Sequence, residues 1–164
     1  MNWYLIVKYL HILAVTITTG GMFARQMVRG IAKKNDDVKA VATLTQVAHR
    51  IDRMMVIPWS NTILIFGVIL AVMMKWPIFG FLQGASQNWL LVSNILLIIM
   101  LSLIPGVFIP HNRKVDGLVQ SGLTLGKVTP ELKAALHDQK NQTAHHVEEI
   151  IVLVVAGLMV LKPF

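Results

Sequence analysis

The sequence predicts an all-α, polytopic membrane protein that folds as a four-helix bundle. Four strongly apolar stretches, at about residues 3–23, 54–74, 89–109 and 145–161, are separated by polar stretches. Each is close to the roughly 20 residues that an α-helix needs to cross the hydrocarbon core of a bilayer. Hydrophobic residues make up 55% of the chain and charged residues 14%, whereas a soluble domain carries about 25% charged residues. We therefore expect residues 1–164 to form a single transmembrane domain in contact with lipid.

The basic residues are distributed unevenly, and this predicts the orientation. Most of the 15 lysines and arginines lie in segments 24–53 and 110–144. Short basic loops stay in the cytoplasm, so we expect an N-out, C-out topology with these two segments as cytoplasmic helical extensions. The expected location is a bacterial inner (plasma) membrane. Topology and lipid headgroups account for the net charge of +7, and we predict no nucleic-acid partner.

The first half of the chain contains clear helix signals. Trp3 and Tyr4 suit an interfacial aromatic belt at the start of the first span, whose helix is expected to continue past the membrane. Residues 35–37 (NDD) are a turn and helix-cap signal. Apolar residues then recur at helical spacing through residues 38–53. Pro58 is expected to bend the second span, because its ring removes a backbone hydrogen bond.

The second half contains further helix-ending and helix-starting signals. Residues 75–77 (KWP) end the second span and begin a short outer loop. Residues 105–106 (PG) predict a kink near the inner end of the third span. Segment 112–128 is predicted to be the least ordered region. Residues 129–131 (TPE) have the cap, the proline and the acid of a helix start, and this helix is expected to run unbroken to Leu161.

His11 is the clearest polar residue at membrane depth. It lies about 12 Å below the outer interface by helical rise, which is too deep for its side chain to reach water. An imidazole there can hydrogen-bond a partner helix, relay protons or ligate a metal. Thr18 and Arg25 lie near the same helix face, and the small pair Gly20-Gly21 permits close approach by another helix or by a flat ring. The residues alone leave these uses open. The chain has no cysteine, which excludes thiolate metal sites and covalently attached haem.

A second group of histidines and acids is predicted to gather at the inner boundary of the bundle. Three helices bring imidazoles to similar depth there, and this favours either a haem site with two axial histidines or a non-haem metal site with mixed ligands. The alternative is that these side chains are solvated, with one of the glutamates paired to Arg50 or Arg53. At least one glutamate is expected to face the bundle interior. The group comprises His49, His111, His145, His146, Glu148 and Glu149.

Short motifs resemble a known group of bacterial membrane proteins. KYLHIL at residues 8–13 and GGMF at residues 20–23 resemble the first helix of small four-helix proteins related to the copper-resistance D family and the J-type protoporphyrinogen oxidases. LMVLKP at residues 158–163 is similar to the end of one uncharacterised branch of that group. The resemblance implies that His11 ligates a b-type haem and that the partner is a quinone or a porphyrin-like molecule. The porphyrinogen-oxidase pattern does not continue beyond the first helix.

The leading hypothesis is an integral membrane protein that binds haem b and transfers electrons, with quinone as its partner. Such a protein would be a possible membrane oxidoreductase. His11 would ligate iron, and the inner group would hold a second centre, through His49, His111 or His145, or carry protons. Arg25 and Arg53 would pair with haem propionates, since guanidinium binds carboxylate bidentately. One alternative is a non-enzymatic accessory subunit bound to partner subunits or to a second copy of itself. The other is a non-haem metal protein using the inner His/Glu group.

Overall fold

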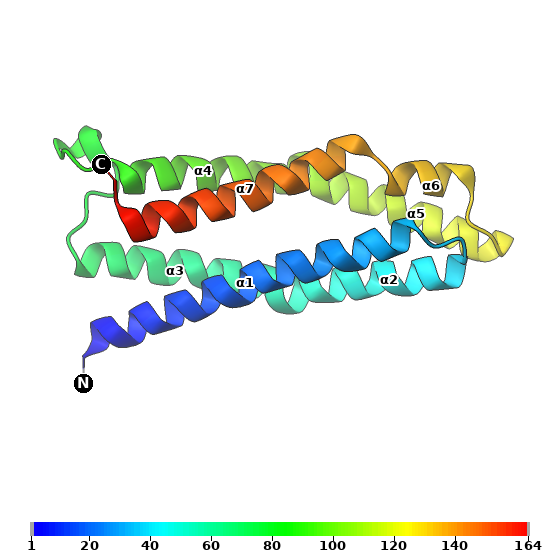
Figure 1. The fold of residues 1–164 in the computed structure, drawn as a ribbon, viewed down its shortest axis with the longest axis horizontal. Helices are drawn as coiled ribbons and strands as arrows, with labels where there is room; N and C mark the ends of the chain where they lie inside the picture. Colours follow the sequence, from blue (N-terminus) through cyan, green and yellow to red (C-terminus); the bar gives the residue numbers. More distant parts are fainter. Residues whose placement is uncertain (1, 164) are drawn as a thin grey trace.

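The computed structural model describes residues 2–163 and consists of helices joined by short turns, with no strand in that range (Figure 1). Four helical segments are long and apolar enough to cross a membrane: Trp3–Lys33, Val38–Met73, Trp89–Leu125 and Pro130–Leu161. The predicted all-α class and the four spans are confirmed. Each segment continues beyond its predicted span at the same end of the bundle. We call this the basic end; it is where the turns at residues 34–37 and 126–129 lie.

The turn after α1 (Trp3–Lys33) is capped as the sequence predicts. The Asp37 side chain accepts a hydrogen bond from the backbone N–H of Lys39 and so begins α2 (Val38–Ile51). The neighbouring carboxylate of Asp36 lies 2.8 Å from the Lys133 ammonium group on α6 (Pro130–Leu136). Because that ammonium group hydrogen-bonds the carboxylate and attracts its charge, the pKa of Asp36 is below its ordinary value. This exposed ion pair connects the turn after α1 to α6.

The second segment changes its helical pitch just before Pro58. The π-helical turn η1 (Asp52–Val56) lies between α2 and α3 (Ile57–Met73), and its last bond runs from the Ile57 N–H to the Asp52 carbonyl. A proline has no N–H to donate, and its ring collides with the carbonyl four residues earlier. The wider turn relieves that collision, so the predicted distortion is found one turn before Pro58. Such π turns are frequent at functional sites.

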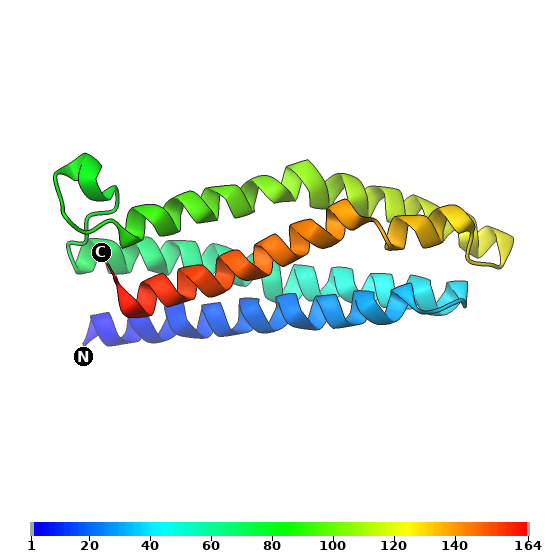
Figure 2. The ribbon, with the colours of Figure 1, turned by 45° about the horizontal axis from the view of Figure 1, so that its top comes forward.

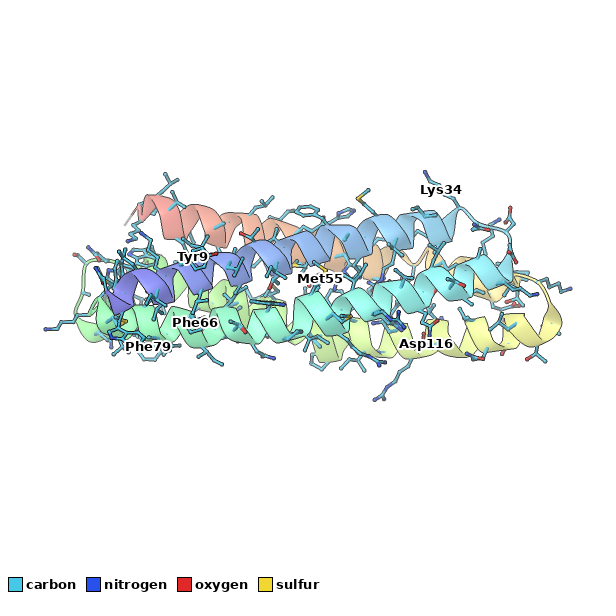
Figure 3. The ribbon with its side chains drawn as sticks, turned by 90° about the horizontal axis from the view of Figure 1, so that it is seen from below. Tyr9, Lys34, Met55, Phe66, Phe79 and Asp116 are labelled. Atoms are coloured by element: carbon cyan, nitrogen blue, oxygen red, sulfur yellow. The ribbon has the colours of Figure 1, made fainter. Side chains whose placement is uncertain are left out.

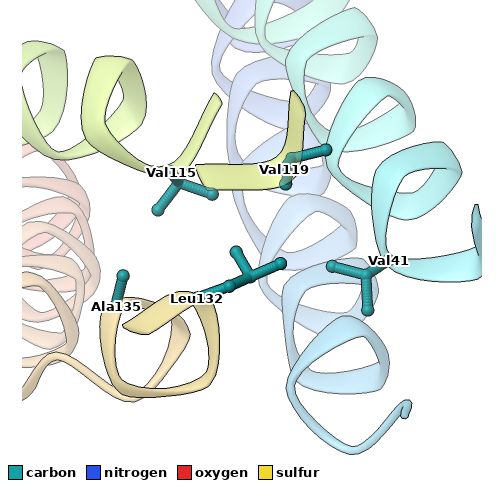
Figure 4. Close-up of a cluster of buried hydrophobic side chains, with 5 residues drawn as sticks. All are labelled: Val41, Val115, Val119, Leu132 and Ala135. Atoms are coloured by element: carbon teal, nitrogen blue, oxygen red, sulfur yellow. The ribbon is translucent and has the colours of Figure 1, made fainter. Parts of the chain in front are cut away.

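The third segment has a second π-helical turn, again at a proline. It divides into α4 (Trp89–Leu103), η3 (Ile104–Phe108) and α5 (Ile109–Leu125). The bend expected at Pro105 is visible in Figure 2. The prediction that segment 112–128 is poorly ordered is wrong, because α5 continues as a helix to Leu125. Tertiary packing explains the difference: Val115 and Val119 lie against Val41 and Leu132 in a buried cluster (Figure 4).

The fourth segment is not one straight helix, which corrects another prediction. It divides at His137 and Asp138 into α6 and α7 (Gln139–Leu161). The Asp138 side chain accepts a hydrogen bond from the backbone N–H of Lys140, so a second cap begins α7. The cap at the start of α6 is as predicted, with the Thr129 hydroxyl accepting from the N–H of Leu132.

The four segments form two pairs. α1 packs along α2 and α3, and α4 packs against α7, while α2, α5 and α6 join the pairs at the basic end (Figure 2). At the opposite end, the 3-10 turn η2 (Gly80–Gln83) lies within the loop between α3 and α4, and Trp76 meets Trp89 edge to face. Figure 3 shows Lys34 and Asp116 towards the basic end and Tyr9, Phe66 and Phe79 towards the other. Large apolar side chains are exposed along the half of the bundle that lies away from the basic end, as a lipid-facing surface requires.

Candidate functional site

Arg25 is the centre of a buried charged network that connects three of the four segments. It is only 5% exposed, although it is an arginine in an apolar helix. Its guanidinium group lies 2.7 Å from Asp52 of η1 and 2.6 Å from Glu148 of α7. A guanidinium group has donors in a planar fork, so one arginine can bind two carboxylates at once. Arg25 therefore joins α1 to both the second and the fourth segments.

Arg29, one turn along α1, extends the network to the third segment. Its guanidinium group donates to His145, lies 3.5 Å from Asp52 and lies 3.4 Å from the Asn112 side-chain oxygen on α5. Asp52 thus receives both arginines. Two arginines and two carboxylates make the network neutral. This pairing is what allows four charged groups to remain so far from water.

His145 is completely enclosed by this network. It is 2% exposed, and its ring stacks on Phe108 with centroids 4.3 Å apart and planes 8° apart. Arginine can only donate, so the ring nitrogen facing Arg29, Nε2, accepts. The other nitrogen, Nδ1, lies 3.1 Å from Glu148 and donates to it. Both nitrogens of His145 are therefore occupied by protein groups.

A polar cavity of about 240 Å³ lies beside the network at the basic end. Its wall includes the four inner histidines that the sequence singled out, from α2, α5 and α7. Pockets for drug-sized ligands measure about 300–1,000 Å³, so this cavity suits a smaller group. The other cavity-lining side chains are polar or small, apart from Val115 and Leu136. Besides the four histidines, the polar ones include Arg29, Lys33, Asn112, Asn141, Gln142 and Glu149.

The inner histidines do not converge on one point. His49 lies 3.7 Å from Asp116, His111 lies 3.4 Å from Asp138, and His146 lies 3.4 Å from Glu149. Each imidazole thus has its own acidic neighbour. Within residues 2–163, no group of three or more histidine and acidic side chains is arranged to hold a metal ion. The predicted inner metal site therefore has no preformed set of ligands in this structure.

The two glutamates at the start of the fourth span behave differently. Glu148 is buried, in agreement with the expectation that at least one faces the interior, while Glu149 is half-buried. Glu148 binds Arg25 instead of Arg50 or Arg53. Arg53 is exposed and does not line the cavity. Since both carboxylate partners of Arg25 are already in place, Arg25 is not free to bind a propionate.

His11 lies apart from this cavity, between α1 and α3. Its ring packs against Gly67, where an added Cβ would lie 3.3 Å from the Cε1 atom. The Nδ1 atom of the imidazole is buried without a hydrogen-bond partner. The missing side chain at Gly67 is what makes room for the ring. One nitrogen of His11 is therefore buried without a partner in this structure.

Sequence reasoning did not predict Arg29, Asn112, Asn141 or Phe108 as members of the site. Arg25 and Arg29 are four residues apart and so lie on one helix face, and this spacing was the available signal for Arg29. The other three residues meet the site only through the packing of α5 and α7.

Comparison with known proteins assigns the chain to a membrane family. No curated protein and no solved structure matches it significantly. A family model matches residues 5–163, almost the whole chain. The relation to the copper-resistance D and porphyrinogen-oxidase group stays a prediction. The chain belongs to the family described as "Predicted integral membrane protein (DUF2269)".

Proposed function

We propose that this integral membrane protein binds haem b through His11 and exchanges electrons with a quinone. The observation that carries the proposal is the unpaired Nδ1 atom of His11, buried at membrane depth. A buried polar atom without a partner costs about 1–3 kcal/mol, and a bound metal centre is one of the ways in which this cost is removed. Imidazole is a common axial ligand of haem iron.

We assign the cofactor to His11 and a structural role to the Arg25 network, because their hydrogen-bonding partners differ. His11 has a nitrogen without a hydrogen-bond partner, and its ring packs against Gly67. A haem would supply one-electron chemistry when bound. The Arg25 network, in which two arginines balance two carboxylates, would hold the helices in place. Arg25 is therefore not proposed as a propionate partner.

A second haem at the basic end is not proposed. His145 has both nitrogens engaged, and the cavity of about 240 Å³ is below the roughly 300–1,000 Å³ of pockets for drug-sized ligands. A non-haem metal at the same place would have to separate at least two histidines from their acidic neighbours. These observations favour His11 over the inner histidines as the cofactor ligand.

Visible spectroscopy tests the proposal. The full chain, purified from haem-supplemented cells, is expected to show a Soret band that shifts on dithionite reduction and reverts when a quinone is added. His11→Ala should abolish most of this band. His137→Ala is the matched control, because His137 is exposed and lies outside both sites. His145→Ala should also retain the band.

Two results would contradict the proposal. One is a colourless parent protein that remains colourless after incubation with haem, which would favour an accessory role. The other is a Soret band that survives His11→Ala but is lost in His145→Ala, which would move the haem to the basic end. A band that is reduced by dithionite but not reoxidised by quinone would contradict only the quinone part.

A further inference from the structure

The cavity at the basic end contains binding groups that the Arg25 network does not use. Lys33 lines it and forms no ion pair within residues 2–163. Asn141 lines it as well, is 7% exposed, and has a side-chain oxygen with no hydrogen-bond partner. The cavity wall therefore contains an unpaired cation and, buried within it, an unpaired acceptor. Together they match an anionic group that also carries a hydroxyl donor.

A small apolar crevice of about 10 Å³ lies between α1 and α7, next to the cavity. Glu149 lines both. On the far side of Glu149 the crevice walls are apolar except for Thr19, with Met22 and Phe23 from α1 facing Val152 and Leu153 from α7. Because Val152 lies one helical turn beyond Glu149, the lining changes from polar to apolar along the direction in which the helices enter the membrane.

We propose that this site binds an anionic phospholipid, with its phosphate headgroup in the cavity and its acyl chains against the apolar surface of α1 and α7 beside it, where Phe23 and Leu153 are exposed. Lys33 supplies positive charge to the phosphate, and the Asn141 oxygen accepts from a headgroup hydroxyl such as that of phosphatidylglycerol. The apolar parts of the four segments end beside the cavity, so it lies at the depth of the headgroups. A quinone ring fits less well, because it is neutral and its carbonyl oxygens cannot donate to Asn141.

Lipid titration of the purified chain in a neutral detergent tests this inference without any haem. Phosphatidylglycerol is expected to bind more tightly than phosphatidylcholine by native mass spectrometry and to raise the unfolding temperature. Lys33→Gln should weaken phosphatidylglycerol binding about fivefold, the factor that corresponds to one basic residue near an anionic headgroup. Lys34→Gln is the matched control, because Lys34 is the exposed neighbour outside the cavity.

The apolar surface beside the cavity is tested separately with Leu153→Trp against Val154→Trp; both side chains are exposed, but only Leu153 lies beside the cavity at the crevice. Only Leu153→Trp should weaken lipid binding. Glycerol phosphate, which has the headgroup without a chain, is expected to bind at least tenfold more weakly than the lipid.

The inference is overturned if the two lipids bind equally, or if Lys33→Gln and Lys34→Gln behave alike. Equal binding of glycerol phosphate and lipid would instead identify a site for a soluble anion. Each variant is first checked for helix content by circular dichroism. None of these outcomes depends on His11, so they are distinguishable from failure of the haem proposal.

Discussion

Replacing Arg25 with methionine is expected to destabilise the protein by about 3–5 kcal/mol, the cost of leaving a buried charge without its partner. The Arg25 side chain is 6% exposed and its two carboxylate partners lie at 2.7 and 2.6 Å. After the substitution, Asp52 still has Arg29 at 3.5 Å, whereas the Glu148 carboxylate keeps only His145. Most of the loss should therefore come from Glu148, whose side chain is 9% exposed.

A double-mutant cycle separates the ion pair from the loss of packing. Glu148→Leu alone leaves Arg25 bound to Asp52 and should cost less than Arg25→Met. Combining Arg25→Met with Glu148→Leu removes both charges, so the double variant should be more stable than the sum of the single effects predicts, by at least about 1 kcal/mol. The measurement is reversible unfolding in mixed micelles, followed by loss of the helical circular dichroism signal.

Arg50→Met is the control for the general effect of removing an arginine. Arg50 is exposed at the same end of the bundle, and its substitution should change the free energy of unfolding by less than about 0.5 kcal/mol. The reasoning is refuted if Arg25→Met is as mild as Arg50→Met, or if the effects of Arg25→Met and Glu148→Leu are simply additive. Either result would mean that the charged groups are hydrated rather than paired in the membrane-embedded protein.

Two further predictions concern helix contact and pH. Gly21→Ala should destabilise the protein by about 1–3 kcal/mol, because its Cβ would lie 2.8 Å from the Met55 Cβ atom; Gly20→Ala, which meets nothing within 4 Å, should be neutral or stabilising in the same unfolding assay. The pKa of Asp36 is lowered by Lys133, so the ion pair stabilises the fold above the ordinary carboxyl pKa and loses its effect as the pH falls through the lowered value. Lys133→Met should raise the Asp36 pKa towards its ordinary value in a carboxyl NMR titration, and an unchanged pKa would exclude this pair in solution.

Local signals in the sequence were sufficient to predict the membrane class and many of the helix limits. The four apolar stretches, the caps at Asp37 and Thr129 and the distortions near Pro58 and Pro105 all depend on residues within one or two turns. For that reason they were readable without knowledge of the fold. The burial of one of the two glutamates, Glu148 and Glu149, was also predictable, because a carboxylate in an apolar span faces the bundle interior.

Other features were decided only by contacts between distant segments. The order of α5 comes from the buried cluster around Leu132, and the partner of Glu148 is Arg25, which is 123 residues away in the chain. The sequence grouped His145 with the other histidines of the cavity but could not show that its nitrogens are occupied by Arg29 and Glu148.

The sequence by itself thus determined how many helices cross the membrane and which residues are costly to place there, because hydropathy and helix capping are local properties. The tertiary structure alone decided which of those residues satisfy one another and which are left free. Charge pairing and cavity shape depend on how four helices approach at one depth, and that approach is set by packing. For this reason Lys33 emerged as a candidate binding group only after the helices were placed together, whereas His11 was already a candidate from its depth in the first span.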